Sequence, residues 1–198
     1  MTVAALTLFV LALLLVGGVC AAVQRRRTGD SGVRMPSGAR DWGAPLTGAV
    51  GGFLTGAAAP VADLLGLPLL PWLDEPAARL TGLALAAAGM AAVFAAQLAM
   101  GVSWRTTVDP TEHPPLVTAG PFRLVCNPIY AALTVVIASL ALAVPNAIAV
   151  LGLAVMALGI EIQVRRIEEP YLQSIHGSDY QRYAARTGRF LPGLGRLR

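Results

Sequence analysis

The sequence predicts an all-α, polytopic membrane protein with about five transmembrane helices, and three observations support this prediction. Of the 198 residues, 56% are hydrophobic and only 13% are charged, which is too apolar for a soluble domain of this length. The mean hydropathy is +0.65. The apolar residues also fall in long runs, each about as long as the roughly 20 residues that cross a bilayer core as a helix.

The first apolar run, 2–23, ends at three arginines, Arg25, Arg26 and Arg27. A secretory signal peptide carries its positive charges before the apolar stretch, so we expect an uncleaved helix whose C-terminal end lies inside the cell. The polar stretch that follows, 28–42, is rich in Gly, Ser and Arg and is expected to be an irregular connection.

Two further runs, 44–67 and 77–101, are expected to form a second and a third span. The second run is rich in Gly and Ala, and such small residues allow close approach between membrane helices. It is therefore expected to pack centrally. The segment between the two runs, 68–76, contains prolines, acidic residues and Trp72, and this composition predicts a short external turn with an aromatic interface anchor.

The stretch 102–128 contains five prolines and cannot form one continuous helix. Its polar, broken backbone must lie in water or line a protein cavity. The last apolar stretch, 129–164, is too long for one crossing, and Pro145-Asn146 near its middle predicts a hairpin of two short helices. A charged tail, 165–198, is expected to begin as a continuation of the second of these helices.

The arginines predict the orientation. All 15 basic residues are Arg, and they cluster beside the apolar runs. With the N-terminus outside, the segments 24–43 and 102–128 and the C-terminal tail face the cytosol, and only Arg79 lies outside. We divide the chain into an N-terminal half of three spans, 1–101, and a half with a loop, a hairpin and a tail, 102–198.

Several function classes are excluded or disfavoured. The net charge of +4 suggests nucleic acid, but no basic stripe interleaved with aromatic residues occurs, so no nucleic-acid binding is expected. Two histidines, His113 and His176, without clustered thiols make no convincing metal site. Cys20 and Cys126 are expected to be free thiols.

Two polar segments that the topology brings to the same membrane face are candidates for chemistry. In 116–130, Gly120-Pro121 predicts a turn, and Asn127-Pro128 precedes the fourth span, whose first N–H groups could hold a carboxylate. The alternative is a re-entry loop capped by Asn127. In the second segment, Glu168 and Glu169 repel unless a cation neutralises them. A sulfonium or ammonium ligand would do so, and so would the neighbouring arginines.

These segments carry a resemblance. The motif 116–123 (LVTAGPFR), the motif 127–130 (NPIY), the pair Glu168-Glu169 and a tail that ends in 189–192 (RFLP) resemble, in this order, the isoprenylcysteine carboxyl methyltransferase family and the wider phospholipid methyltransferase group. The resemblance covers about 100–192. One departure is Cys126-Asn127-Pro128, where the family usually has Arg-His-Pro. Asn127 can still form hydrogen bonds, but it cannot carry charge.

The resemblance implies S-adenosylmethionine as methyl donor, bound between the loop before the fourth span and the Glu168-Glu169 helix. It places Arg165 and Glu169 as catalytic groups acting on the substrate. The acceptor would be a lipophilic carboxylate or thiol of the isoprenylcysteine kind, small or lipid-anchored, that enters from the membrane lipids through a passage formed by the first spans. The cofactor contacts that it implies are Val117, Gly120, Pro121, Asn127, Pro128, Tyr130, Glu168 and Glu169.

Two other interpretations remain open from the sequence. A membrane reductase of the sterol-reductase type has a similar arrangement of spans and loops, and it would bind NADPH instead. A non-enzymatic membrane module, in which the polar motifs only stabilise the bundle, would bind neither cofactor. The oligomeric state cannot be read from the sequence.

Overall fold

A computed structural model describes residues 1–36 and 42–196, and within them regular secondary structure is helical apart from two isolated β-bridges. The all-α prediction is confirmed. Part of the predicted connection 28–42 lies outside the described residues. The helices are α1 (Thr2–Leu13), α2 (Cys20–Thr28), α3 (Gly43–Phe53), α4 (Ala59–Leu64), α5 (Pro76–Met100), α6 (Pro128–Ala143), α7 (Ala147–Ile162), α8 (Glu169–His176) and α9 (Ser178–Arg186).

Three π-helical segments join consecutive helices without interrupting them. Leu14–Val19 joins α1 to α2, Leu54–Ala58 joins α3 to α4, and Gln163–Glu168 joins α7 to α8. Three of the apolar runs therefore each form one long helix that changes its register once. Such segments often lie at functional sites, and the first and third contribute residues to a cavity described below.

Four of the resulting helices are long and apolar enough to cross a membrane: Thr2–Thr28, Gly43–Leu64, Pro76–Ser103 and Ala147–His176. The chain is therefore an integral membrane protein. The fifth helix, α6, has 16 residues, which at the usual rise is about 24 Å, less than the roughly 30 Å of a bilayer core. The predicted count of five spans is thus not confirmed by length, although α6 packs within the bundle beside α5.

The predicted hairpin at Pro145-Asn146 is present. Asn146 is fully buried, its side-chain oxygen accepts a hydrogen bond from Ala149 N (3.0 Å), and its side-chain nitrogen donates to Ala59 O (2.9 Å). It therefore caps α7 and ties the turn to α4. The two arms, α6 and α7, have 16 residues each, and the helix that begins at Ala147 continues to His176, as predicted for the start of the tail.

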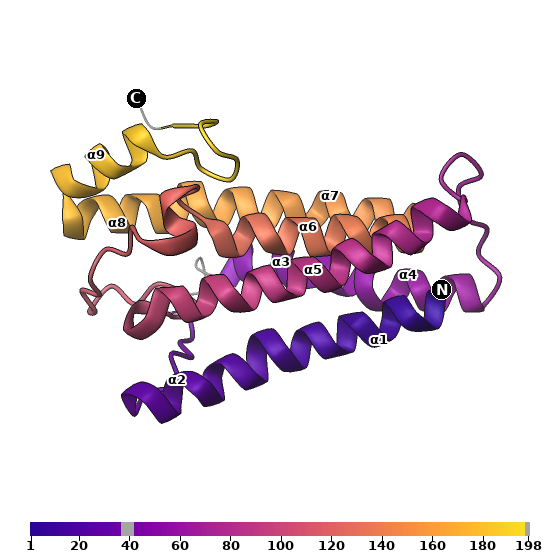
Figure 1. Cartoon of the computed structure of the whole chain (residues 1–198), viewed down its shortest axis with the longest axis horizontal. Coiled ribbons are helices and arrows are strands. Elements are labelled where there is room, and N and C mark those ends of the chain that lie inside the picture. The colour runs from indigo at the N-terminus through magenta and orange to yellow at the C-terminus, as the bar shows by residue number, and fades with distance from the viewer. Residues whose placement is uncertain (37–41, 197–198) are drawn as a thin grey trace.

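The glycine-rich second span packs along α7, as its composition predicts. A Cβ on Gly152 would lie 2.7 Å from Thr55 N, and one on Gly159 would lie 2.6 Å from Gly48 N. The two backbones are therefore in contact, and only glycine fits at these positions. α1 lies at the edge of the bundle and exposes large apolar side chains, as expected of a lipid-facing helix (Figure 1).

The two ends of the bundle differ in charge. One end holds α2 with its three arginines, the 101–127 segment, α8, α9 and the tail; we call it the arginine-rich end (Figure 1). The opposite end holds the N-terminus and the turns at 65–75 and 144–146. Arg79 lies there and donates hydrogen bonds to Ala143 O (3.0 Å) and Asp74 Oδ1 (2.8 Å). Its role at that end is structural.

Candidate functional site

Two of the cavities at the arginine-rich end have Glu168 in their lining. The larger, which we call the wide cavity, has a volume of about 300 Å³ and is bounded by the π-helical segment Leu14–Val19, by α5, α6 and α8, and by the 103–114 segment. The smaller, the loop cavity, has about 90 Å³ and lies under the 114–128 segment beside α9. The two share lining residues, so they adjoin each other. The shared residues include Ser103, Ile129, Tyr130, Glu168 and Leu172.

The wide cavity has two chemically different sides. Its apolar side comes from the spans, with Val16, Gly17, Met100, Ile129 and Leu133. Its polar side comes from the segment after α5, from the end of the π-helical segment Gln163–Glu168 and from α8, and it includes Arg105, Asp109, Glu112, Glu168 and Tyr171. The cavity therefore joins lipid-facing helices to a charged surface.

Glu168 lies where the two cavities meet. Its Oε1 accepts hydrogen bonds from the Tyr130 hydroxyl and from Gln163 Nε2, the latter at 3.1 Å. Its Oε2 has no hydrogen-bond partner in residues 1–36 and 42–196. Gln163 and Glu168 are five residues apart, and the π-helical segment between them turns both side chains to the same side. One carboxylate oxygen is thus anchored and the other is available to the cavities.

Glu169 is held quite differently. Arg189 donates to both of its oxygens, with Nε 2.5 Å from Oε1 and Nη2 3.0 Å from Oε2. The two side chains are only 12% and 11% exposed. The hydrogen bond to Glu169 raises the pKa of the Arg189 guanidinium. Both oxygens of Glu169 therefore point to the tail.

The same arginine residue also holds the loop. Arg189 O accepts hydrogen bonds from the backbone N–H (3.1 Å) and the side chain (3.3 Å) of Asn127. Next to it, Gly188 O accepts from Cys126 N at 2.8 Å. Burial raises the pKa of the Cys126 thiol to about 11, so this free cysteine is un-ionised at neutral pH. Arg189 therefore links α8, through its side chain, to the loop that lines the loop cavity, through its carbonyl.

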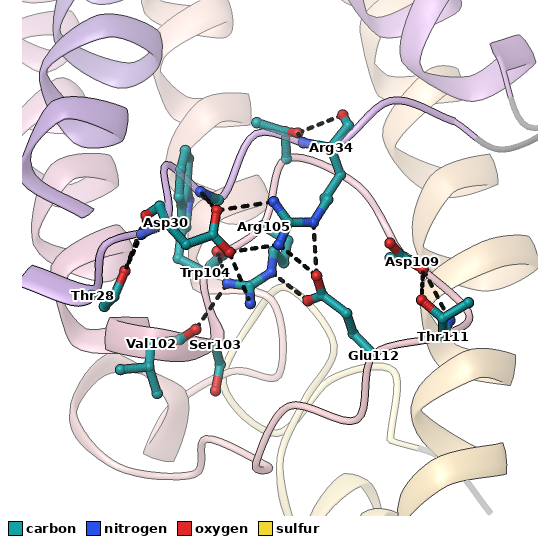
Figure 2. A network of polar contacts seen from close by, with 12 residues as sticks. Thr28, Asp30, Arg34, Val102, Ser103, Trp104, Arg105, Asp109, Thr111 and Glu112 are labelled. Carbon is teal, nitrogen blue, oxygen red and sulfur yellow. Dashed lines mark hydrogen bonds and ion pairs between the residues drawn. The ribbon is translucent and has the colours of Figure 1, made fainter. Parts of the chain in front are cut away.

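A four-residue charge network closes the polar side of the wide cavity (Figure 2). Arg34 pairs with Asp30 (2.6 Å) and Glu112 (2.5 Å), and Arg105 pairs with Glu112 (2.5 Å). The Arg34 guanidinium holds the pKa of both carboxyls below their ordinary range. Glu112 O also accepts from the Tyr171 hydroxyl at 2.6 Å. The segment after α2, the segment after α5, and α8 are therefore held together at the cavity.

Comparison with known proteins identifies the family. A family model described as phospholipid methyltransferase matches residues 77–179, just over half of the chain. The chain belongs to the phospholipid methyltransferase family. The match runs from the first turn of α5 into the first turn of α9. It therefore includes the charged residues that line the two cavities, Arg105, Asp109, Glu112 and Glu168. A search of curated proteins found no match.

Membership of this methyltransferase family confirms the resemblance drawn from the motifs and supports a transferase role in the membrane. The structure places several residues implied by that resemblance together. Val117, Asn127 and Pro128 line the loop cavity, and Tyr130 and Glu168 line both cavities.

Other implied residues do not line either cavity. Gly120 has a φ of +59° and, with Pro121, forms the turn that opens the loop, so both shape the site from outside it. Arg165 has a side chain that is 55% exposed and pairs with Glu161. Glu169 pairs with Arg189 instead, and no ion pair joins Arg165 to Glu169 among the described residues.

Three contacts at the site were missed by the sequence reasoning. Gln163 is a polar residue near the end of an apolar run, but its spacing to Glu168 is not α-helical. Arg189 was noted only as part of a motif. Arg34 and Glu112 are 78 residues apart, and no local pattern pairs them.

Proposed function

We propose that this family member transfers a methyl group from S-adenosylmethionine to a lipophilic carboxylate or thiol that enters from the bilayer. The observation that carries this proposal is the pair of adjoining cavities with Glu168 at their junction. The loop cavity lies under the 114–128 segment and includes the polar groups of Asn127, Tyr130 and Glu168, and the wide cavity is bounded by lipid-facing helices. A water-soluble donor and a lipophilic acceptor can therefore meet at one point.

The residues around the loop cavity suit this donor. S-adenosylmethionine carries a sulfonium and an ammonium cation, and Glu168 offers a carboxylate oxygen with no other partner in the described chain. Asn127 and Tyr130 supply polar groups beside it, and Val117 and Pro128 supply apolar surface. The loop cavity alone is small for a ligand of this size, so the donor would extend into the wide cavity.

The protein's contribution to the reaction would be alignment and exclusion of water. The donor, when bound, supplies an activated methyl group. Tyr130 and Gln163 fix the position of Glu168, and Arg189 fixes the loop that carries Asn127. The apolar wall from the spans shields the reacting atoms from water, which strengthens the attraction between Glu168 and a bound cation. Glu169 would act as a positioning residue, and Arg165 would lie outside the reaction space.

The proposed orientation places the N-terminus outside and the arginine-rich end in the cytosol, because arginines collect on the cytosolic side of membrane proteins. This orientation gives the donor direct access to the loop cavity. The acceptor would enter between α1 and the bundle, where Val16 and Gly17 border the wide cavity. The family description names phospholipids, and a lipid acceptor would use the same route.

Calorimetric titration of the detergent-purified protein tests the proposal. We expect S-adenosylmethionine and its demethylated product to bind and NADPH not to bind. Val117→Trp fills the loop cavity and should weaken donor binding by about 100-fold, because the new side chain overpacks that space. Val150→Trp, on an exposed position of α7, is the matched control and should bind normally.

Two outcomes would contradict the proposal. Folded protein that binds neither S-adenosylmethionine nor NADPH would indicate the non-enzymatic membrane module. Preference for NADPH over S-adenosylmethionine would indicate the reductase of the sterol-reductase type.

A further inference from the structure

We propose that a third cavity, on the other side of the 121–128 loop from the loop cavity, binds an anionic phospholipid of the membrane leaflet at the arginine-rich end. This lipid is a resident ligand rather than a methyl acceptor, so the site goes beyond the proposed function. Three features of the structure support it: an apolar groove of suitable size, the place of that groove in the membrane, and the arginines at its rim.

The third cavity, which we call the side groove, has a volume of about 550 Å³ and is bounded by the 121–128 loop, α6, α7 and the 190–192 segment of the tail. This volume lies within the range of about 300–1,000 Å³ in which small-molecule sites fall. α6 and α7 lie side by side (Figure 1), and small side chains on both helices leave space between them. The lining is almost entirely apolar and includes Leu124, Ala131, Val135, Ala157, Phe190 and Leu191. A long, flexible acyl chain suits a groove of this kind.

The side groove opens toward lipid near the level of the phospholipid headgroups. Val135 of α6 and Leu158 of α7 are exposed apolar side chains, as expected of a lipid-facing surface. Ala147 follows the turn at the opposite end of the bundle. From there to Arg165 the helix is about 27 Å long at the usual rise, close to the roughly 30 Å of a bilayer core. Arg165 therefore lies where the apolar core of the membrane ends.

The charged groups at the rim of the groove select the headgroup. A chain that enters the groove exchanges one apolar environment for another, so apolar contact gives little preference among lipids. Glu161 lines the groove and pairs with Arg165. Arg123 is exposed and lies in the loop between two lining residues, Pro121 and Leu124. The rim thus carries two arginines and one carboxylate, and basic pockets of this kind beside membrane helices bind anionic headgroups.

The 121–128 loop separates the side groove from the loop cavity. Leu124 and Val125 line the groove, whereas Cys126 and Asn127 line the loop cavity. An acyl chain in the groove therefore supports the loop from the side opposite the methyl donor. A ligand that favours one loop conformation raises its population, so we expect tighter donor binding when the lipid is present. This consequence rests on the proposed function, whereas the lipid site itself does not.

Native mass spectrometry of the detergent-purified protein tests the site with two lipids that have the same chains, dioleoylphosphatidylglycerol and dioleoylphosphatidylcholine. We expect the anionic lipid to bind about fivefold more tightly, the contribution of one arginine near an anionic headgroup. Arg123→Gln should remove this preference and leave the binding of phosphatidylcholine unchanged.

Glu161→Gln is expected to have the opposite effect, because it releases Arg165 from its partner. Phosphatidylglycerol should then bind about fivefold more tightly than it binds to the wild type. Asp179→Asn is the matched control, since it changes the net charge by the same amount and releases Arg182 on α9. None of the described residues of α9 lines the groove, so lipid binding should stay unchanged.

Filling the groove tests where the chain lies. Ala157→Phe places a ring in the groove and should remove the bound lipid, whichever headgroup it carries. Ala154→Phe, at an exposed position of the same helix, is the control and should retain it.

Equal binding of the two lipids by the wild type, an unchanged affinity in Glu161→Gln, or an equal gain in Asp179→Asn would overturn the lipid site. So would lipid retained by Ala157→Phe. Donor titration of the same protein separates this inference from the proposed function. Protein that selects phosphatidylglycerol but binds no donor would refute the proposed function and leave the lipid site standing, and donor affinity that is equal with and without the lipid would overturn the support of the loop.

Discussion

Replacing Glu169 with Gln is expected to destabilise the protein by about 3–5 kcal/mol, because it leaves the Arg189 guanidinium buried without its counter-charge. The two side chains are 12% and 11% exposed, and Arg189 makes two hydrogen bonds to the carboxylate. Arg189 also holds Asn127 through its carbonyl. We therefore expect weaker S-adenosylmethionine binding together with a lower melting temperature, measured on the same purified protein.

The double variant Glu169→Leu/Arg189→Met is the control for this prediction. Replacing both charges with apolar side chains removes the unpaired charge, so the variant should recover most of the lost stability. A Glu169→Gln protein that melts at the wild-type temperature would contradict the structural role of the pair. It would also support the interpretation that Glu169 contacts the substrate.

Gly51→Ala is expected to be the most damaging single-carbon change in the bundle. A Cβ at Gly51 would lie 2.3 Å from Met156 N and 2.7 Å from Gly152 O, both backbone atoms of α7. Because neither atom can move alone, α3 and α7 must separate, and we expect a loss of about 3 kcal/mol or more in unfolding free energy. Unfolding in a denaturing detergent measures this loss.

Gly48→Ala on the same helix is the matched control, since a Cβ there meets no atom within 4 Å. It should unfold at the same concentration of denaturing detergent as the wild type or at a slightly higher one, because alanine favours the helical conformation more than glycine does. Equal stability of the two variants would show that α3 and α7 are not in backbone contact.

The spans could be predicted because each apolar run has the length and composition of a helix that lies in lipid. The turn could be predicted because Pro145-Asn146 is a dipeptide that favours turns. The changes of helical register at the π-helical segments could not be predicted. Nothing in the composition of 163–168 distinguishes a π-helical segment from an α-helix. The resemblance implies that Arg165 and Glu169 act together on the substrate, whereas in the structure Arg165 pairs with Glu161 and Glu169 pairs with Arg189.

The residues of the candidate site could be predicted only where they belong to a short, continuous sequence motif. Asn127, Tyr130 and Glu168 come from two short motifs, and the structure brings them to one space. Their supports come from elsewhere in the fold. Arg189 is 20 residues from Glu169, and Arg34 pairs with a carboxylate 78 residues away. Such pairs depend on how the helices pack, which a single sequence does not record.

Transfer of a labelled methyl group into the membrane tests the central claim most directly. The protein would be reconstituted in total membrane lipid of its source and incubated with methyl-tritiated S-adenosylmethionine, and the organic phase would then be counted. We expect protein-dependent label in the lipid phase that Val117→Trp abolishes. Label that stays in the aqueous phase, with protein shown to bind the donor, would contradict methyl transfer to a membrane acceptor.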